Sequence, residues 1–133
     1  MSYTVMGWAE YILYRAHQNK VCISNTKLQF ILFFLLREFY QATNSVLFNA
    51  ILTISSFPIF QEAYDQYQYF AGAPLYLFGT SLSHEALPLI DVIIDKYTRK
   101  KLFELAAESQ ATLGRPKQGT EFSALDCCQA RVL

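Results

Sequence analysis

The sequence predicts a mainly α, compact single-domain helical bundle of about five helices around a buried central helix. The chain has 133 residues, which is enough for one hydrophobic core and too few for two ordinary domains. Apolar residues make up 53% of it, which favours a packed globule over a disordered chain. In several segments, apolar residues also recur at the spacing of one helix face.

The first two predicted helices differ in how much of their surface is apolar. The first is predicted over residues 3–19, where the apolar residues form one stripe: Val5, Trp8, Ala9, Ile12, Leu13 and Ala16. The second is predicted over residues 26–41, with Ser24 or Asn25 as its N-cap. Because it is apolar almost all round through its middle, we expect neighbours to cover it on several sides.

The segment that follows the second helix is less regular. A short extended piece or β-hairpin is one option at about residues 46–54, where apolar residues alternate and β-branched residues follow. A third helix is predicted over residues 58–70. Pro58 suits its first turn, where a helix needs no N–H from that residue.

The last third of the chain divides into helix and tail. A fourth helix is predicted over residues 84–97 and a fifth over residues 99–109, which Thr98 could cap. Periodicity then disappears into a stretch that holds Gly114, Pro116 and Gly119. We therefore expect a helical domain over residues 1–112 and a flexible C-terminal tail over residues 113–133.

The charge balance bears on the class of partner. Lys and Arg together number 11, and so do Asp and Glu, which gives zero formal net charge. Nucleic-acid binders usually carry a basic excess to neutralise phosphates, so we expect no nucleic-acid partner. Two copies of a neutral chain also repel each other little, which allows a homo-oligomer.

Cysteine usage and hydropathy bear on location. The three cysteines are Cys22, Cys127 and Cys128, an odd number that suggests no disulfide framework. No basic, apolar leader is visible at the start, and a cytoplasmic location is expected. The strongly apolar residues 28–36 are too few to span a bilayer, which takes roughly 20. Residues 40–61 are interrupted by polar side chains, so we expect no membrane partner.

Residues with catalytic or metal-binding chemistry are sparse. His84-Glu85 lacks a second histidine four positions on, and Cys127-Cys128 are adjacent rather than spaced as zinc ligands. Asp91 and Asp95 lie at helical spacing, but paired carboxylates on exposed helix faces are usually solvated. We expect no enzyme activity and no cofactor, and a hydrolase or a metalloprotein is the weakest interpretation.

A series of aromatic residues is the more informative feature. Its members are Tyr64, Tyr67, Tyr69, Phe70 and Tyr76. Core packing with hydroxyls that reach water is one interpretation. A partner-facing patch is the other, because tyrosine joins apolar area to a hydrogen-bonding tip.

Residues 23–34, which read ISNTKLQFILFF, resemble the signature of the Panacea domain family, the SocA-like antitoxins. That signature is roughly I-T-N-x-K-L-Q-K-L-L-Y-F. The segments LFNA at residues 47–50 and PIFQEAY at residues 58–64 are similar to further family segments, and the resemblance covers about residues 5–109. The chain departs from the family at Ile51 and Phe57, where the family has Trp and Gly, and the family's terminal T-H-x-E-x-P-W motif survives at most as Ala106-Ala107-Glu108, without its His and Trp.

The resemblance implies an antitoxin-like protein that neutralises a toxin by direct binding or escorts it to a protease as an adaptor. An alternative keeps the fold but makes the chain a phage or mobile-element inhibitor that binds a host defence protein. Lys27 and Gln29 would either satisfy loop carbonyls around the central helix or touch the partner. The candidate protein-binding residues are Tyr64, Tyr67, Tyr69, Phe57, Pro58, Lys27 and Gln29.

Overall fold

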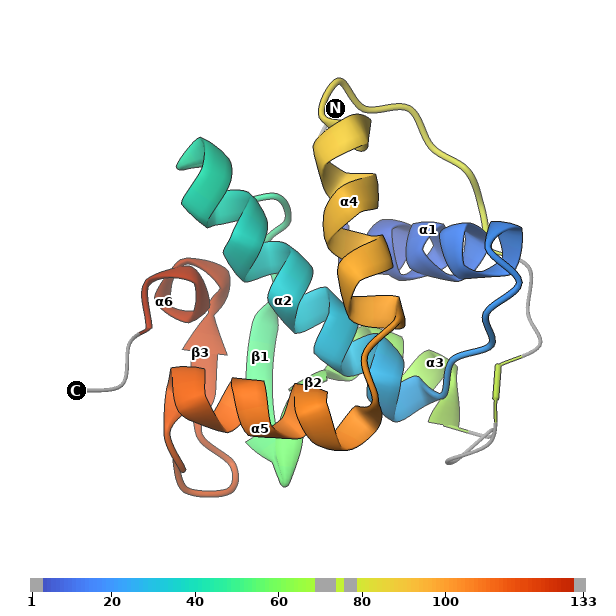
Figure 1. The fold of residues 1–133 in the computed structure, drawn as a ribbon. Helices are drawn as coiled ribbons and strands as arrows, with labels where there is room; N and C mark the ends of the chain where they lie inside the picture. The colour runs from blue at the N-terminus through green and yellow to red at the C-terminus, as the bar shows by residue number, and fades with distance from the viewer. Residues whose placement is uncertain (1–3, 69–73, 76–78, 131–133) are drawn as a thin grey trace.

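Helix α2 (Asn25–Thr43) runs through the middle of the fold, with the other elements arranged around it (Figure 1). The computed structural model describes residues 4–68, 74–75 and 79–130. The Ser24 side chain caps α2 by accepting the Lys27 N–H at 3.1 Å. Every residue from 28 to 37 is buried, so α2 is covered around its whole circumference. The prediction of a mainly α, compact single domain around a buried central helix is confirmed.

Helices α1 (Val5–Gln18) and α4 (Leu87–Thr98) pack on α2 and on each other. All six residues of the predicted apolar stripe of α1 are buried. On α4, Ile90, Ile94 and Tyr97 are buried, and the Tyr97 ring stacks on Phe34 of α2 with centroids 4.4 Å apart. These contacts follow from the helical spacing of apolar residues in the sequence.

A small antiparallel sheet packs on α2, with the strand order β2-β1-β3. Its strands are β1 (Ile51–Ser55), β2 (Phe57–Phe60) and β3 (Glu121–Ser123). Strands β1 and β2 form a hairpin, with Ser56 between them in the left-handed region at φ 50°. The hairpin therefore lies later in the chain than the predicted residues 46–54.

Strand β2 occupies the first residues that were predicted to be helical, and helix α3 is only Gln61–Gln66. The reason lies in the backbone of Ile54, which pairs with Pro58 across the hairpin. Ile54 donates to Thr120 O at 2.9 Å and accepts from the Gly119 N–H at 2.6 Å, both on the β3 side. Because antiparallel pairs alternate, Pro58 occupies a position that needs no N–H.

Helix α5 (Leu102–Leu113) begins three residues later than predicted. Thr98 does not cap it, because the Thr98 hydroxyl donates to Asp95 O at 3.1 Å. Lys101 occupies the N-cap position instead, and the Glu104 side chain accepts its N–H at 3.0 Å. The carboxylate in the first turn also suits the positive end of the helix.

The prediction of a flexible tail is wrong for residues 121–129, which form β3 and helix α6 (Ala124–Gln129). Ala124, Cys127 and Cys128 are buried against the core. The buried Arg37 guanidinium of α2 donates to the carbonyl of Cys127 and, at 3.0 Å, to that of Ala130. A three-residue strand and a six-residue helix are too short to show a clear period in the sequence.

No helix in the described part of the chain has both the length and the apolar character needed to cross a membrane.

Thiol reactivity tests the docking of α6. Burial raises the pKa of the Cys127 thiol to about 12 and that of Cys128 to about 11, whereas Cys22 is exposed. We expect a thiol reagent at mildly alkaline pH to label Cys22 alone in the folded protein, because the thiolate is the reactive form. All three cysteines should react in denaturant. Equal rates for the three thiols in the folded protein would show that this segment does not dock.

Candidate functional site

Gln29 supports the framework of the fold from the interior. Its side-chain oxygen accepts the Phe60 N–H at 2.9 Å, and its amide group donates to the Asn25 side chain at 3.1 Å. Asn25 in turn donates to Tyr64 O at 3.0 Å. Because Gln29 is fully buried, the predicted contact with a partner is wrong for this residue. It also satisfies an N–H on the outer edge of β2 rather than a loop carbonyl.

Lys27 binds a backbone carbonyl next to the central helix, which was one of the two roles expected for it. Its ammonium donates to Thr98 O at the end of α4 at 2.7 Å. A cation suits this position because the last carbonyls of a helix carry partial negative charge. Burial lowers the pKa of Lys27, an effect that the nearby Glu104 carboxylate opposes. The Lys27 contact therefore ties α2 to the end of α4.

The predicted tyrosine patch is only partly at the surface. Tyr67 is buried, and that burial raises its pKa, so the expected partner contact is wrong for this side chain. Tyr64 is half-buried, with its ring centroid 6.1 Å from that of Phe57. Tyr69 lies outside the described residues. Among the predicted aromatic residues that the structure describes, Phe57 and Tyr64 thus stay near the surface, whereas Phe70 and Tyr76, like Tyr69, lie outside the described residues.

A groove lies between the turn of the β1–β2 hairpin and the C-terminal end of α5. We call it the hairpin groove, and it measures about 250 Å³. Its lining residues are Ile54, Ser56, Phe57, Pro58, Ser109, Gln110, Leu113, Gly114, Arg115, Pro116 and Gln118. Apolar side chains from both walls thus meet polar ones in one hollow. Two of the predicted site residues, Phe57 and Pro58, belong to this lining.

The groove depends on backbone turns at both of its ends. Ser56 and Gly114 both have positive φ, at 50° and 73°. Gly114 ends α5 by donating its N–H to Gln110 O at 2.7 Å, and the chain then leaves along the groove through Arg115 and Pro116. Glycine takes this conformation at the end of a helix with little strain.

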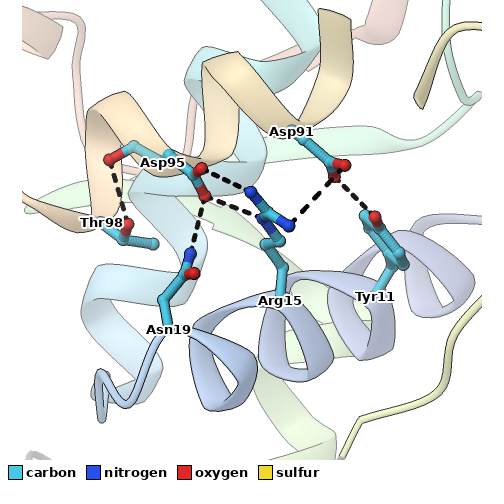
Figure 2. A network of polar contacts seen from close by, with 6 residues as sticks. All are labelled: Tyr11, Arg15, Asn19, Asp91, Asp95 and Thr98. Carbon is cyan, nitrogen blue, oxygen red and sulfur yellow. Dashed lines mark hydrogen bonds and ion pairs between the residues drawn. The ribbon is translucent and has the colours of Figure 1, made fainter. Parts of the chain in front are cut away.

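A second cluster of polar side chains joins α1 to α4 (Figure 2). Arg15 donates to both carboxylate oxygens of Asp95, from Nε at 3.0 Å and from a terminal nitrogen at 2.7 Å. Asn19 donates to Asp95 at 3.0 Å, and the Tyr11 hydroxyl donates to Asp91 at 2.5 Å. The expectation that these two carboxylates are solvated is therefore wrong. Side chains from α1 and from its C-cap residue Asn19 bind both of them.

The carboxylates of this cluster serve to hold two helices together. A bidentate pair between arginine and carboxylate is among the stronger and more directional charge contacts. Arg15 also lies 3.9 Å from Asp91, so one guanidinium bridges both acids. The spacing of these residues in the sequence could have indicated the cluster. Tyr11 and Arg15 are four residues apart, as are Asp91 and Asp95. Two such pairs on facing helices can match each other.

The described residues contain no group of three His, Cys, Asp or Glu side chains that could hold a metal ion.

The contact between Arg15 and Asp95 has a pH signature. Hydrogen bonds from Arg15 hold the pKa of Asp95 below its ordinary value of 3.8 against the opposing effect of burial. Asp95→Asn should therefore lower the free energy of unfolding at neutral pH by about 1–2 kcal/mol, more than loss of an exposed pair. The stability that the Asp95 charge adds to the wild-type protein is complete above pH 3.8, the ordinary pKa of the group. It is lost as the pH falls through the lower pKa that Asp95 has in the folded state.

Urea unfolding at a series of pH values measures this effect. The exposed Asp65 provides the matched control, and Asp65→Asn should change the stability by less than about 0.5 kcal/mol. A stability loss in Asp95→Asn that persists undiminished at low pH would contradict the role of the carboxylate charge.

Gln29→Leu should lower the free energy of unfolding by about 1–3 kcal/mol, because the buried Phe60 N–H would lose its acceptor. Gln41→Leu replaces an exposed glutamine of the same helix and should change it by less than about 0.5 kcal/mol. Chemical denaturation of both variants measures the difference. Equal stability would show that Gln29 does not secure β2.

Comparisons with known proteins give no information on the function of this chain. The chain matches no protein-family model, no curated protein and no solved structure. The hairpin groove is therefore the structural observation that bears on what the chain binds.

Proposed function

We propose that this chain is a protein-binding module that neutralises a toxin, either by direct binding or by escorting it to a protease. The observation that carries the proposal is the hairpin groove, where apolar and hydrogen-bonding side chains line one hollow. Anchors at protein interfaces are typically single large side chains that fill such hollows.

The size of the groove favours a side chain over a small-molecule ligand. It measures about 250 Å³, below the range of roughly 300–1,000 Å³ that is usual for drug-sized ligands. Its walls offer apolar contact from Ile54, Phe57 and Leu113. A leucine or an aromatic ring from a partner fits this combination of size and lining.

Arg115 supplies the groove with a cation. This residue is exposed, and no described residue forms an ion pair with it. Arginine is enriched among the residues that dominate binding energy, because its planar group can both pair with carboxylates and stack on rings. The groove therefore favours a partner segment with an apolar anchor next to an acidic residue.

The choice of a toxin as partner comes from the resemblance over residues 23–34. The residues that carry it most specifically, Lys27 and Gln29, tie α2 to α4 and β2. They support the fold that presents the groove rather than the contact itself. Partner choice then rests on the groove walls, which differ from the family pattern at Phe57.

That difference favours a second candidate function, inhibition of a host defence protein by a phage or mobile-element product. Phe57 replaces the glycine of the family pattern and lines the groove. A ring in place of a hydrogen changes the shape of the docking surface. The two functions share the groove and differ in the identity of the bound protein.

Co-expression with the product of an adjacent gene tests the first function. We expect a complex in pull-down and rescue of growth when that product is toxic. Arg115→Glu should weaken the complex by about 30-fold or more, as expected for a dominant interface residue. Lys20→Glu makes the same charge change on the loop after α1 and should weaken it by less than about fivefold.

Neither a complex nor growth rescue with any neighbouring gene product would contradict the toxin partner. Binding to a co-expressed defence protein, with the same loss in Arg115→Glu, would instead support the second function. Equal effects of Arg115→Glu and Lys20→Glu would contradict the groove as the docking site.

A further inference from the structure

Cys127 and Cys128 form a pair of adjacent thiols inside the fold, on helix α6. Cys127 is fully buried and Cys128 is 4% exposed. The Cys128 thiol donates to Leu36 O on α2 at 3.4 Å. Burial, and after it the neighbouring Cys128 thiol, raises the pKa of Cys127. The two thiols therefore interact with each other, and neither of them lines the hairpin groove.

Contacts at both ends hold α6 in place while the thiols are reduced. Ser123 caps the first turn by accepting the Asp126 N–H at 3.1 Å. At the other end, the Arg37 guanidinium donates to the carbonyls of Cys127 and Ala130. A helix of six residues has little stability of its own, so these contacts decide whether α6 forms. A change in the backbone at residues 127–128 would displace a carbonyl that Arg37 binds.

Helix α6 also secures the strand before it. Strand β3 leads directly into α6 and pairs with β1, where Phe122 lies opposite Leu52. The two residues at 119–120, just before β3, bond to the backbone of Ile54, which lines the hairpin groove. The opposite wall of the groove comes from residues 109–118, which lead into this pairing. Undocking of α6 would therefore loosen the groove.

We propose that Cys127 and Cys128 are a redox-sensitive latch, in which a disulfide between the two adjacent thiols releases α6 from α2. In a helix, the side chains of adjacent residues point about 100° apart. Their Cα atoms lie about 3.8 Å apart across one peptide bond, whereas a relaxed disulfide joins Cα atoms about 4.4–6.8 Å apart. The backbone must therefore leave the helical form before the disulfide can close. A disulfide under such constraint is readily reduced, which makes the change reversible.

Exchange with a small disulfide, such as glutathione disulfide, supplies the oxidation. One cysteine thiolate attacks this oxidant and expels one glutathione thiolate, which leaves a mixed disulfide on the chain. The second cysteine thiolate attacks the chain sulfur of that bond and expels the other glutathione. The two cysteines thus lose two protons and two electrons, and the oxidant becomes two thiols. Because burial raises the pKa of both thiols, the exchange proceeds when α6 opens.

The latch would give the hairpin groove a response to oxidation. Release of α6 removes the element that anchors residues 119–123 beside Ile54, so one wall of the groove loses its support. A partner that docks in the groove would then bind the oxidised chain more weakly than the reduced chain. This consequence rests on the proposed function, whereas the disulfide and the release of α6 do not.

Oxidation of the purified full chain tests the latch without any partner. Cys22→Ser removes the exposed thiol and provides the background for the measurement. In a buffer of glutathione and glutathione disulfide, we expect mass spectrometry to show the loss of two hydrogens from residues 118–131. Hydrogen exchange of the amides in β3 and α6 should become about tenfold faster or more, because these elements lose their tertiary support. A dithiol reductant should restore the original exchange rates.

Cys22→Ser combined with Cys128→Ala is the matched control, because a single thiol cannot close the disulfide. This variant should keep slow hydrogen exchange in α6 in the same buffer, and circular dichroism checks that it keeps its helices. Equal acceleration of exchange in the control would overturn the inference. The same holds if Cys127 and Cys128 stay reduced or carry only glutathione in a buffer that oxidises Cys22 of the wild-type chain. A disulfide that leaves exchange in α6 unchanged would also overturn it.

Partner binding distinguishes the latch from the proposed function. A reduced chain that binds no partner would contradict the proposed function, whatever happens to the two thiols. A reduced chain that binds its partner, with thiols that fail the oxidation test, would reject the latch and leave the proposed function standing.

Discussion

The burial of α2 is the constraint on which the rest of the structure depends. Every residue from 28 to 37 is removed from solvent, so this helix cannot be stable with only one covered face. Each large apolar side chain on it contributes about 1.5–3 kcal/mol when fully buried. Helices α1 and α4, the sheet, α5 and α6 all pack on α2, as Figure 1 shows. The order of these elements around α2 follows from the need to close its circumference.

This constraint explains which parts of the fold could be predicted from the sequence. The four longer helices, α1, α2, α4 and α5, were visible in their periodicity, and α1 and α2 lie within two residues of their predicted ends. The hairpin position and α6 were not visible, because their form depends on partners distant in sequence. Ile54 pairs with residues 119–120, and Arg37 holds the end of α6. A six-residue helix has little stability of its own, so tertiary contacts decide whether it forms.

The polar residues of α2 show why the candidate site could be predicted only in part. Lys27, Gln29 and Arg37 each bind the backbone of a neighbouring element, at Thr98, Phe60 and Cys127. The sequence marked Lys27 and Gln29 as special but could not separate a framework role from a partner contact. Phe57 and Pro58 line a surface hollow because of the β1–β2 hairpin, whose position the sequence did not predict. The other wall of that hollow comes from residues 109–118, far away in sequence and partly assigned to the tail.

The packing around α2 leaves a hollow between the β1–β2 hairpin and the C-terminal end of α5. Lys27, Gln29 and Arg37 of α2 already hold other elements, and the acids of α4 are engaged by Arg15 and Tyr11. Helix α5 differs because it packs chiefly on α2 and keeps Phe103 and Leu102 in solvent. Its C-terminal end forms a wall of the hairpin groove, so an exposed ring and a hollow lie on one rigid element. The turns of α5 therefore hold the ring and the hollow at a fixed spacing.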